Sequence, residues 1–227
     1  MKTIIKIFLG ISIVVLGYMC IQSIMTPIKF DKEKEFREKA VIQRLVDIRK
    51  AQLEFKDQKG GFTTSIDTLI GFLKTAKKKA VLKEGSLSDK QLEAGLTEAK
   101  AAKIVKSKNM KEIIANGLEN FRRDTAYISV LDALFPDQYT QETIDKLAII
   151  PYSNNEKFEL KVNNSYLNTS QILIPLFDAS AHYKTYLHDL NHQELLNTID
   201  LRVKLEKFPG LKVGSVDEPN NFSGNWE

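Results

Sequence analysis

The stretch from Ile7 to Ile28, IFLGISIVVLGYMCIQSIMTPI, decides how the rest of the chain is organised. It holds 22 residues without a charge, between Lys6 and Lys29. At about 1.5 Å per residue a helix of this stretch is about 33 Å long, close to the hydrocarbon core of a bilayer at about 30 Å. No other part of the chain could wrap a helix that is apolar on every face. We therefore expect residues 1–30 to form a transmembrane segment.

We expect this segment to stay attached to the protein as a signal-anchor. A cleaved signal peptide has an apolar core of about 7–15 residues and then a site with small residues. Here Gly10-Ile11-Ser12 comes too early, and Gly17-Tyr18-Met19 ends in a bulky residue. A lipoprotein site needs a small residue before its cysteine, whereas Met19 precedes Cys20. Cleavage of the segment and lipidation of Cys20 are the alternatives.

The basic residues that flank the segment give opposing indications of its orientation. Lys2, Lys6 and the amino terminus favour an N-terminus in the cytoplasm. A larger basic group after the segment favours the reverse, but long domains cross the membrane largely regardless of charge. We expect a single-pass protein of the inner membrane whose body is extracytoplasmic, in the periplasm. The basic residues after the segment are Lys29, Lys32, Lys34, Arg37 and Lys39.

Residues 31–58 have the pattern of one amphipathic helix. Five uncharged side chains recur at intervals of 4, 3, 4 and 3 residues, which places them on one stripe. Phe36 and Ala40 extend this stripe backwards, and we expect Arg37 to lie outside it. The stripe packs either on the chain's own domain or on a partner helix in an assembly. Its members, the candidate helix-interface residues, are Val41, Leu45, Ile48, Gln52 and Phe55.

The next part of the chain, up to residue 120, reads as mainly helical. Gly60-Gly61 ends the long helix, as a left-handed cap would. Thr64 or Ser65 then caps a short helix. Residues 86–108 are rich in Ala, Glu and Lys and predict surface helices, the first of them with a capping box from Ser88 to Gln91.

From residue 121 the pattern changes to strands. We expect strands over 125–135, 148–152, 157–162, 172–177 and 181–187, with a hairpin turn at Ser153–Glu156, and then a final helix over 192–207 capped by Asn191. Helices followed by strands indicate an α+β fold: a transmembrane helix that continues into a long amphipathic helix, then a small antiparallel sheet with flanking helices. The predicted domains are 1–30, 31–120, 121–216 and a polar tail, 217–227. We expect the tail to be loosely held, with docking on the body through Trp226 as the alternative.

Composition limits the possible partners. The net charge is +4, but residues 31–227 carry 30 basic and 29 acidic side chains. A nearly neutral body lacks the basic face that phosphate-backbone binding needs, so we expect no nucleic-acid partner. The single cysteine excludes an intrachain disulfide and a cysteine-based zinc site.

One string resembles a catalytic motif. His188-Asp189-Leu190-Asn191-His192 differs from the H-E-x-x-H metalloprotease helix by Asp189 in place of Glu. That motif needs both histidines one turn apart on a continuous helix, whereas Asn191 reads as a helix cap that leaves His188 outside. We therefore expect no enzymatic activity and no cofactor, with a metal-dependent hydrolase at His188 and His192 as the minor alternative.

The N-terminal third resembles type IV pilins and the pseudopilins of type II secretion. An uncut apolar helix leads into the amphipathic run AVIQRLVDIRKAQ at 40–52, followed by Gly60-Gly61-Phe62 and the short helix SIDTL at 65–69. The prepilin peptidase site is absent, because Val15 stands where the glutamate after Gly10-Ile11 should be. The rest resembles uncharacterised single-pass envelope proteins of bacteria. The resemblance implies a structural or assembly component.

We therefore expect a membrane-anchored envelope protein that acts through protein–protein contacts, either with another protein or with copies of itself. The alternative is a membrane-anchored module that binds a glycan or a peptide. Exposure of Tyr166, Tyr183, Tyr186 and Trp226 on one face would favour this alternative, and their burial would count against it.

Overall fold

The computed structural model describes residues 2–227, and for 2–3, 80–84 and 122–126 it describes the backbone alone. The fold is α+β, with a long apolar N-terminal helix and small antiparallel sheets, as the sequence predicted. The chain forms two compact units. Unit 1 consists of Met1–Phe72 and Thr140–Glu227, and unit 2 of Leu73–Tyr139.

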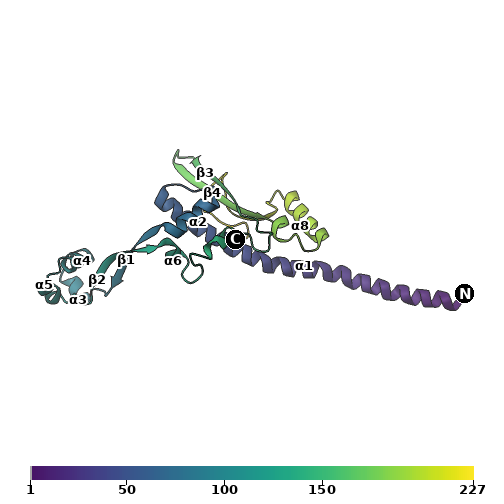
Figure 1. Ribbon diagram of the computed structural model, residues 1–227, viewed down its shortest axis with the longest axis horizontal. Coiled ribbons are helices and arrows are strands. Elements are labelled where there is room, and N and C mark those ends of the chain that lie inside the picture. Colours follow the sequence, from purple (N-terminus) through teal and green to yellow (C-terminus); the bar gives the residue numbers. More distant parts are fainter. Residues whose placement is uncertain (1) are drawn as a thin grey trace. The chain divides into compact units, whose positions relative to one another are not determined.

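Helix α1 (Lys2–Lys59) is unbroken and contains Pro27. It ends at Gly60, whose φ of 84° is left-handed and whose N–H donates to the carbonyl of Lys56 at 2.7 Å. The predicted helix and glycine cap are thus confirmed. From Ile4 on, α1 is long and apolar enough to cross a membrane, and none of its most apolar 18-residue window is buried. Figure 1 shows this N-terminal half projecting beyond the strands and helices of unit 1.

The sheet of unit 1 has three antiparallel strands in the order β3 (Glu159–Leu167), β4 (Leu173–His182) and β5 (Gly210–Gly214). Phe177, Ala179 and Ala181 alternate along one face of β4 and are fully buried, because α1 packs against β4 and β5. Strand β5 was not predicted, since its five residues directly follow Pro209 and carry no long apolar run.

Four short helical elements complete unit 1. They are α2 (Ile66–Thr75), which continues into unit 2, the 3₁₀ helix η1 (Ile144–Leu147), α7 (Tyr183–Tyr186) and α8 (His192–Lys204). Ser65 Oγ accepts from the N–H of Thr68 at 3.2 Å, and Asn191 Oδ1 accepts from the N–H of Glu194 at 3.1 Å, so both predicted caps are confirmed.

The predicted strand 181–187 is wrong beyond His182. Tyr183 and Tyr186 are both fully buried, and a helical turn places residues three apart on one face. In a strand the two rings would point to opposite faces, and one would lie in water.

The C-terminal tail is docked on unit 1, so the expected loose segment is wrong and the alternative, docking on the body, is what the structure has. Phe222 stacks on Phe177 with ring centroids 5.2 Å apart. The backbone N–H of Asn225 donates to the carbonyl of Lys212 at 2.9 Å, and Gly224 forms a bridge with Val213. The tail thereby continues the sheet at the edge formed by β5.

Unit 2 is built on a two-stranded ribbon. Strands β1 (Lys77–Glu84) and β2 (Arg122–Ser129) pair in antiparallel register, and α6 (Val130–Leu134) follows. Between the strands lie α3 (Asp89–Glu93), α4 (Glu98–Lys106) and α5 (Met110–Ala115). Their small core consists of Ala101, Ile113, Leu118 and Phe121.

Two features of unit 2 differ from what the sequence predicted: the end of a strand and the position of a domain boundary. The predicted strand 125–135 ends at Ser129, because Leu131 and Phe135, four residues apart, are buried together as on a helix face. The predicted boundary at residues 120 and 121 falls inside unit 2, since β1 pairs with a strand on the other side of it. The capping box at Ser88 is confirmed, because its N–H donates to Gln91 Oε1 at 2.8 Å.

Candidate functional site

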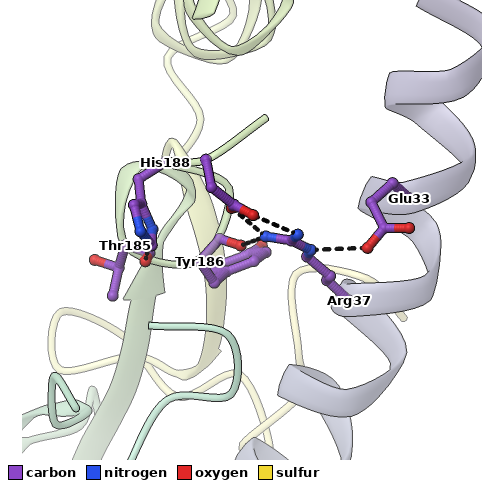
Figure 2. A network of polar contacts seen from close by, with 6 residues as sticks. Glu33, Arg37, Thr185, Tyr186 and His188 are labelled. Carbon is purple, nitrogen blue, oxygen red and sulfur yellow. Dashed lines mark hydrogen bonds and ion pairs between the residues drawn. The ribbon is translucent and has the colours of Figure 1, made fainter. Parts of the chain in front are cut away.

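A well-connected polar site of unit 1 lies around Arg37 of α1, seven residues after Phe30. Arg37 is 7% exposed and uses all three guanidinium nitrogens. Nη2 donates to Asp189 Oδ2 at 2.8 Å, Nη1 to Asp189 Oδ1 and to the carbonyl of Tyr186 at 2.8 Å, and Nε to Glu33 Oε1 at 3.0 Å (Figure 2). We call Glu33, Arg37, Tyr186 and Asp189 the Arg37 cluster.

The geometry of the Arg37 cluster fixes α1 to the loop between α7 and α8. The Arg37–Asp189 pair is bidentate, an arrangement that sets orientation as well as distance. The bond to the Tyr186 carbonyl adds a contact with the last residue of α7. The Arg37 side chain thus joins α1 both to α7 and to the loop that follows it.

Each of Arg37 and Asp189 favours the charged form of the other. The Arg37 guanidinium, mainly through its hydrogen bonds, lowers the pKa of the Asp189 carboxyl to about 2. The same bonds raise the pKa of Arg37. Because the Asp189 side chain is 51% exposed, water screens the pair and its net contribution to stability is modest.

Aromatic side chains lie near the cluster, and the Arg37 guanidinium lies 5.1 Å from the ring centroid of Tyr152, which is 43% exposed. Lys34 Nζ lies 5.7 Å from the ring centroid of Tyr183, and the Arg202 guanidinium lies 6.0 Å from it. The hydroxyls of Tyr183 and Tyr186 are buried without a hydrogen-bond partner in the described part of the chain. Burial raises the pKa of Glu38 beside them, against the opposing effect of Lys34 and Arg202.

The structure places the predicted stripe against the chain's own domain. Val41, Leu45, Ile48 and Gln52 are fully buried in unit 1, and Phe55 is half-buried with its ring 5.0 Å from that of Phe72. Gln52 is held by Thr63, whose carbonyl accepts from Nε2 at 2.7 Å. A partner helix cannot reach these side chains while unit 1 is folded, so this arrangement corresponds to the first of the two alternatives.

The prediction that Arg37 lies outside the stripe is wrong. Arg37 stands four residues before Val41 and is buried in line with it, and Phe30 continues the same line seven residues earlier. Phe36, which was expected on the stripe, is 60% exposed. The spacing of four residues to Val41 was the signal that Arg37 belongs to the buried line. Its charge instead favoured a solvent-exposed position, because its partner Asp189 is 152 residues away and cannot be identified from the local sequence.

The two histidines of the metal-like string are separated by the helix start. His188 Nδ1 lies 3.1 Å from the carbonyl of Thr185, while His192 is the first residue of α8. Asp189 between them pairs with Arg37 of α1. Among the residues with described side chains, no group of three His, Cys, Asp or Glu is placed to hold a metal ion.

The aromatic residues considered for ligand binding do not form one exposed face. Tyr183 and Tyr186 are fully buried, and Tyr166 and Trp226 are half-buried. The Trp226 ring folds over Gly224, where a Cβ would lie 2.4 Å from the ring. These rings contribute to packing in unit 1.

No protein-family model, curated protein or solved structure matches the chain.

Proposed function

We propose that this chain is a single-pass membrane protein whose body acts as a structural or assembly component through protein–protein contacts. The observation that carries the proposal is the Arg37 cluster. All three guanidinium nitrogens of Arg37 are engaged within the chain, so the chemistry of this site is positioning. The cluster fixes the orientation of the body relative to the helix that enters it.

The apolar half of α1 supports the membrane part of the proposal. Large side chains such as Phe8, Val14 and Leu16 are between 60% and 72% exposed on different faces of the helix. Leaving a side chain of this size in water instead of burying it costs about 1.5–3 kcal/mol. A bilayer removes that cost for the whole segment.

For orientation we propose a cytoplasmic N-terminus and an extracytoplasmic body in the envelope. Lys2, Lys6 and the amino terminus support it. A body attached to its span through the Arg37 cluster also suits the structural or assembly role that the pilin-like resemblance implies. The candidate partners are a second copy of the chain or another envelope protein.

The ligand-binding alternative has less support. It needed aromatic side chains gathered on an exposed face, and the burial of Tyr183 and Tyr186 counts against it.

Photo-crosslinking in intact cells tests the assembly proposal. A photoreactive residue at Leu16 in the span or at Leu201 on the exposed side of α8 should give a discrete adduct. The same residue at Lys50, exposed on α1 beyond the apolar half, is the control for random collision. Absence of any adduct, together with a strictly monomeric protein in mild detergent, would overturn the proposal.

Protease accessibility of a C-terminal tag tests the orientation. Cleavage in spheroplasts supports an extracytoplasmic body. Cleavage only after the inner membrane is lysed contradicts it, and then a cytoplasmic adaptor becomes the better explanation.

A further inference from the structure

A hollow of about 740 Å³ lies beside α1 at the end of its apolar half. Its size is within the range of sites that hold small molecules, about 300–1,000 Å³. We call it the junction pocket. It is lined by Thr26, Lys29, Phe30, Lys32, Glu33 and Phe36 of α1 and by Leu190 and Asn191 of the loop before α8.

The junction pocket spans the expected boundary of the membrane. Thr26 belongs to the uncharged run that ends at Ile28, while Lys32 lies about 6 Å beyond Ile28 along the helix axis. The headgroup layer is about 5–8 Å deep on each side of the hydrocarbon core. If α1 spans a membrane, both lysines of the pocket therefore lie at headgroup depth.

The lining combines an apolar wall with unpaired positive charge. Phe30, Phe36 and Leu190 supply the wall. Glu33, the acidic member, is engaged by Arg37. Lys29 and Lys32 form no ion pair with the described side chains, so the pocket attracts an anion. Asn191 uses its oxygen to cap α8, which leaves its amide N–H groups for a ligand.

We propose that the junction pocket binds one anionic phospholipid of the surrounding membrane. Lys29 and Lys32 contact the phosphate, and the apolar wall receives the first part of an acyl chain. Charge complementarity and position at the membrane boundary favour a lipid over a soluble anion, because a free phosphate has no use for the apolar wall. This inference rests on the proposed membrane span of α1.

The test is lipid retention by the full chain, measured by native mass spectrometry. The protein is reconstituted with equal amounts of phosphatidylglycerol and phosphatidylcholine and released in a non-ionic detergent. We expect one retained phosphatidylglycerol per chain. Lysines near a membrane surface contribute about fivefold each to the binding of acidic lipid, so K29A/K32A should reduce retention by about 25-fold.

Two further variants make the result specific. K39A/K50A removes two exposed lysines of α1 outside the pocket and should leave retention unchanged. Phe36→Ser opens the apolar wall at a side chain that is 60% exposed, so the fold should tolerate it. It should reduce the retention of both lipids and preserve the preference for phosphatidylglycerol.

Four outcomes would overturn the inference: equal retention of the two lipids, unchanged retention in K29A/K32A, a shell of many lipids per chain, or displacement by inorganic phosphate alone. Alkaline carbonate extraction separates this failure from that of the proposed function. If the wild-type chain stays in the membrane pellet, only the lipid site is rejected. If it is extracted as a soluble protein, the membrane span fails as well.

Discussion

The two halves of helix α1 share one backbone and have opposite surroundings. Before Phe30, the large apolar side chains from Ile4 to Ile28 are between 39% and 72% exposed. From Phe30 to Ala51, the buried apolar side chains are at most 5% exposed: Phe30, Val41, Leu45, Ile48 and Ala51. The helix is continuous through both halves, so helix formation does not decide which surface is covered.

The difference between the halves lies in the distribution of charge. The first half has no charged residue between Lys6 and Lys29, and so no face suited to water. The second half interleaves charged residues with one buried line, which lets a small domain cover one side. An identical substitution should therefore change the free energy of unfolding differently in the two halves.

The largest expected effect comes from making the same Leu→Ala substitution once in each half of α1. Leu45→Ala leaves a cavity at a fully buried position and should destabilise unit 1 by about 2–5 kcal/mol. Leu16→Ala, at 60% exposure in the first half, should leave the free energy of unfolding of the body within about 0.5 kcal/mol of wild type. Urea denaturation in detergent micelles, followed by the fluorescence of the docked Trp226, measures both. Equal effects would mean that the two halves are not separate environments.

Sequence reasoning succeeded where a rule acts over a few residues. The Gly60 cap, the Asn191 cap and the Ser88 capping box each need only a backbone group within four residues. Hydrophobic spacing likewise identified the stripe from Val41 to Gln52.

It failed where a distant partner changes what a residue prefers. Arg37 is buried only because Asp189 and the Tyr186 carbonyl, 152 and 149 residues away, satisfy its donors. Strand β5 forms because β4 offers it an edge, and the tail docks because β5 offers the next edge. Single-sequence patterns carry no information about such pairings.

The second prediction concerns Arg37, which joins α1 to Tyr186 and Asp189. Arg37→Met keeps the packing of the side chain but leaves the Tyr186 carbonyl without its donor, so unit 1 should lose about 1–3 kcal/mol. Lys39→Met, at an exposed ion pair with Glu35, should change stability by less than about 0.5 kcal/mol. Arg37→Lys should recover only part of the loss, because an ammonium cannot form the bidentate pair. Full recovery would show that charge alone is sufficient.

The third prediction uses pH to weaken the same contact. The pKa of Asp189 is lowered to about 2 in the folded protein, below the ordinary value of 3.8. Its contribution is therefore complete above about pH 4 and is lost as pH falls through about 2. Because Asp189 is half exposed, we expect a loss of about 1 kcal/mol or less. Asp189→Asn should remove this acid-dependent step from urea titrations between pH 5 and 2, and a step of the same size in the variant would contradict the assignment.

The smallest expected effect has the opposite sign and comes from Glu38, one residue further along α1. Burial raises its pKa above 4.5, so the charged form is a cost in the folded state at neutral pH. As pH falls through the raised pKa towards 4.5, that cost is relieved and stability should rise slightly, before the loss at Asp189 begins. Glu38→Gln should be at least as stable as wild type at pH 7 and should lack the rise, measured by the same urea titrations. If Glu38→Gln is clearly destabilised, the contacts of Glu38 with Lys34 and Arg202 outweigh its burial, and the junction depends on two ion-paired sites instead of one.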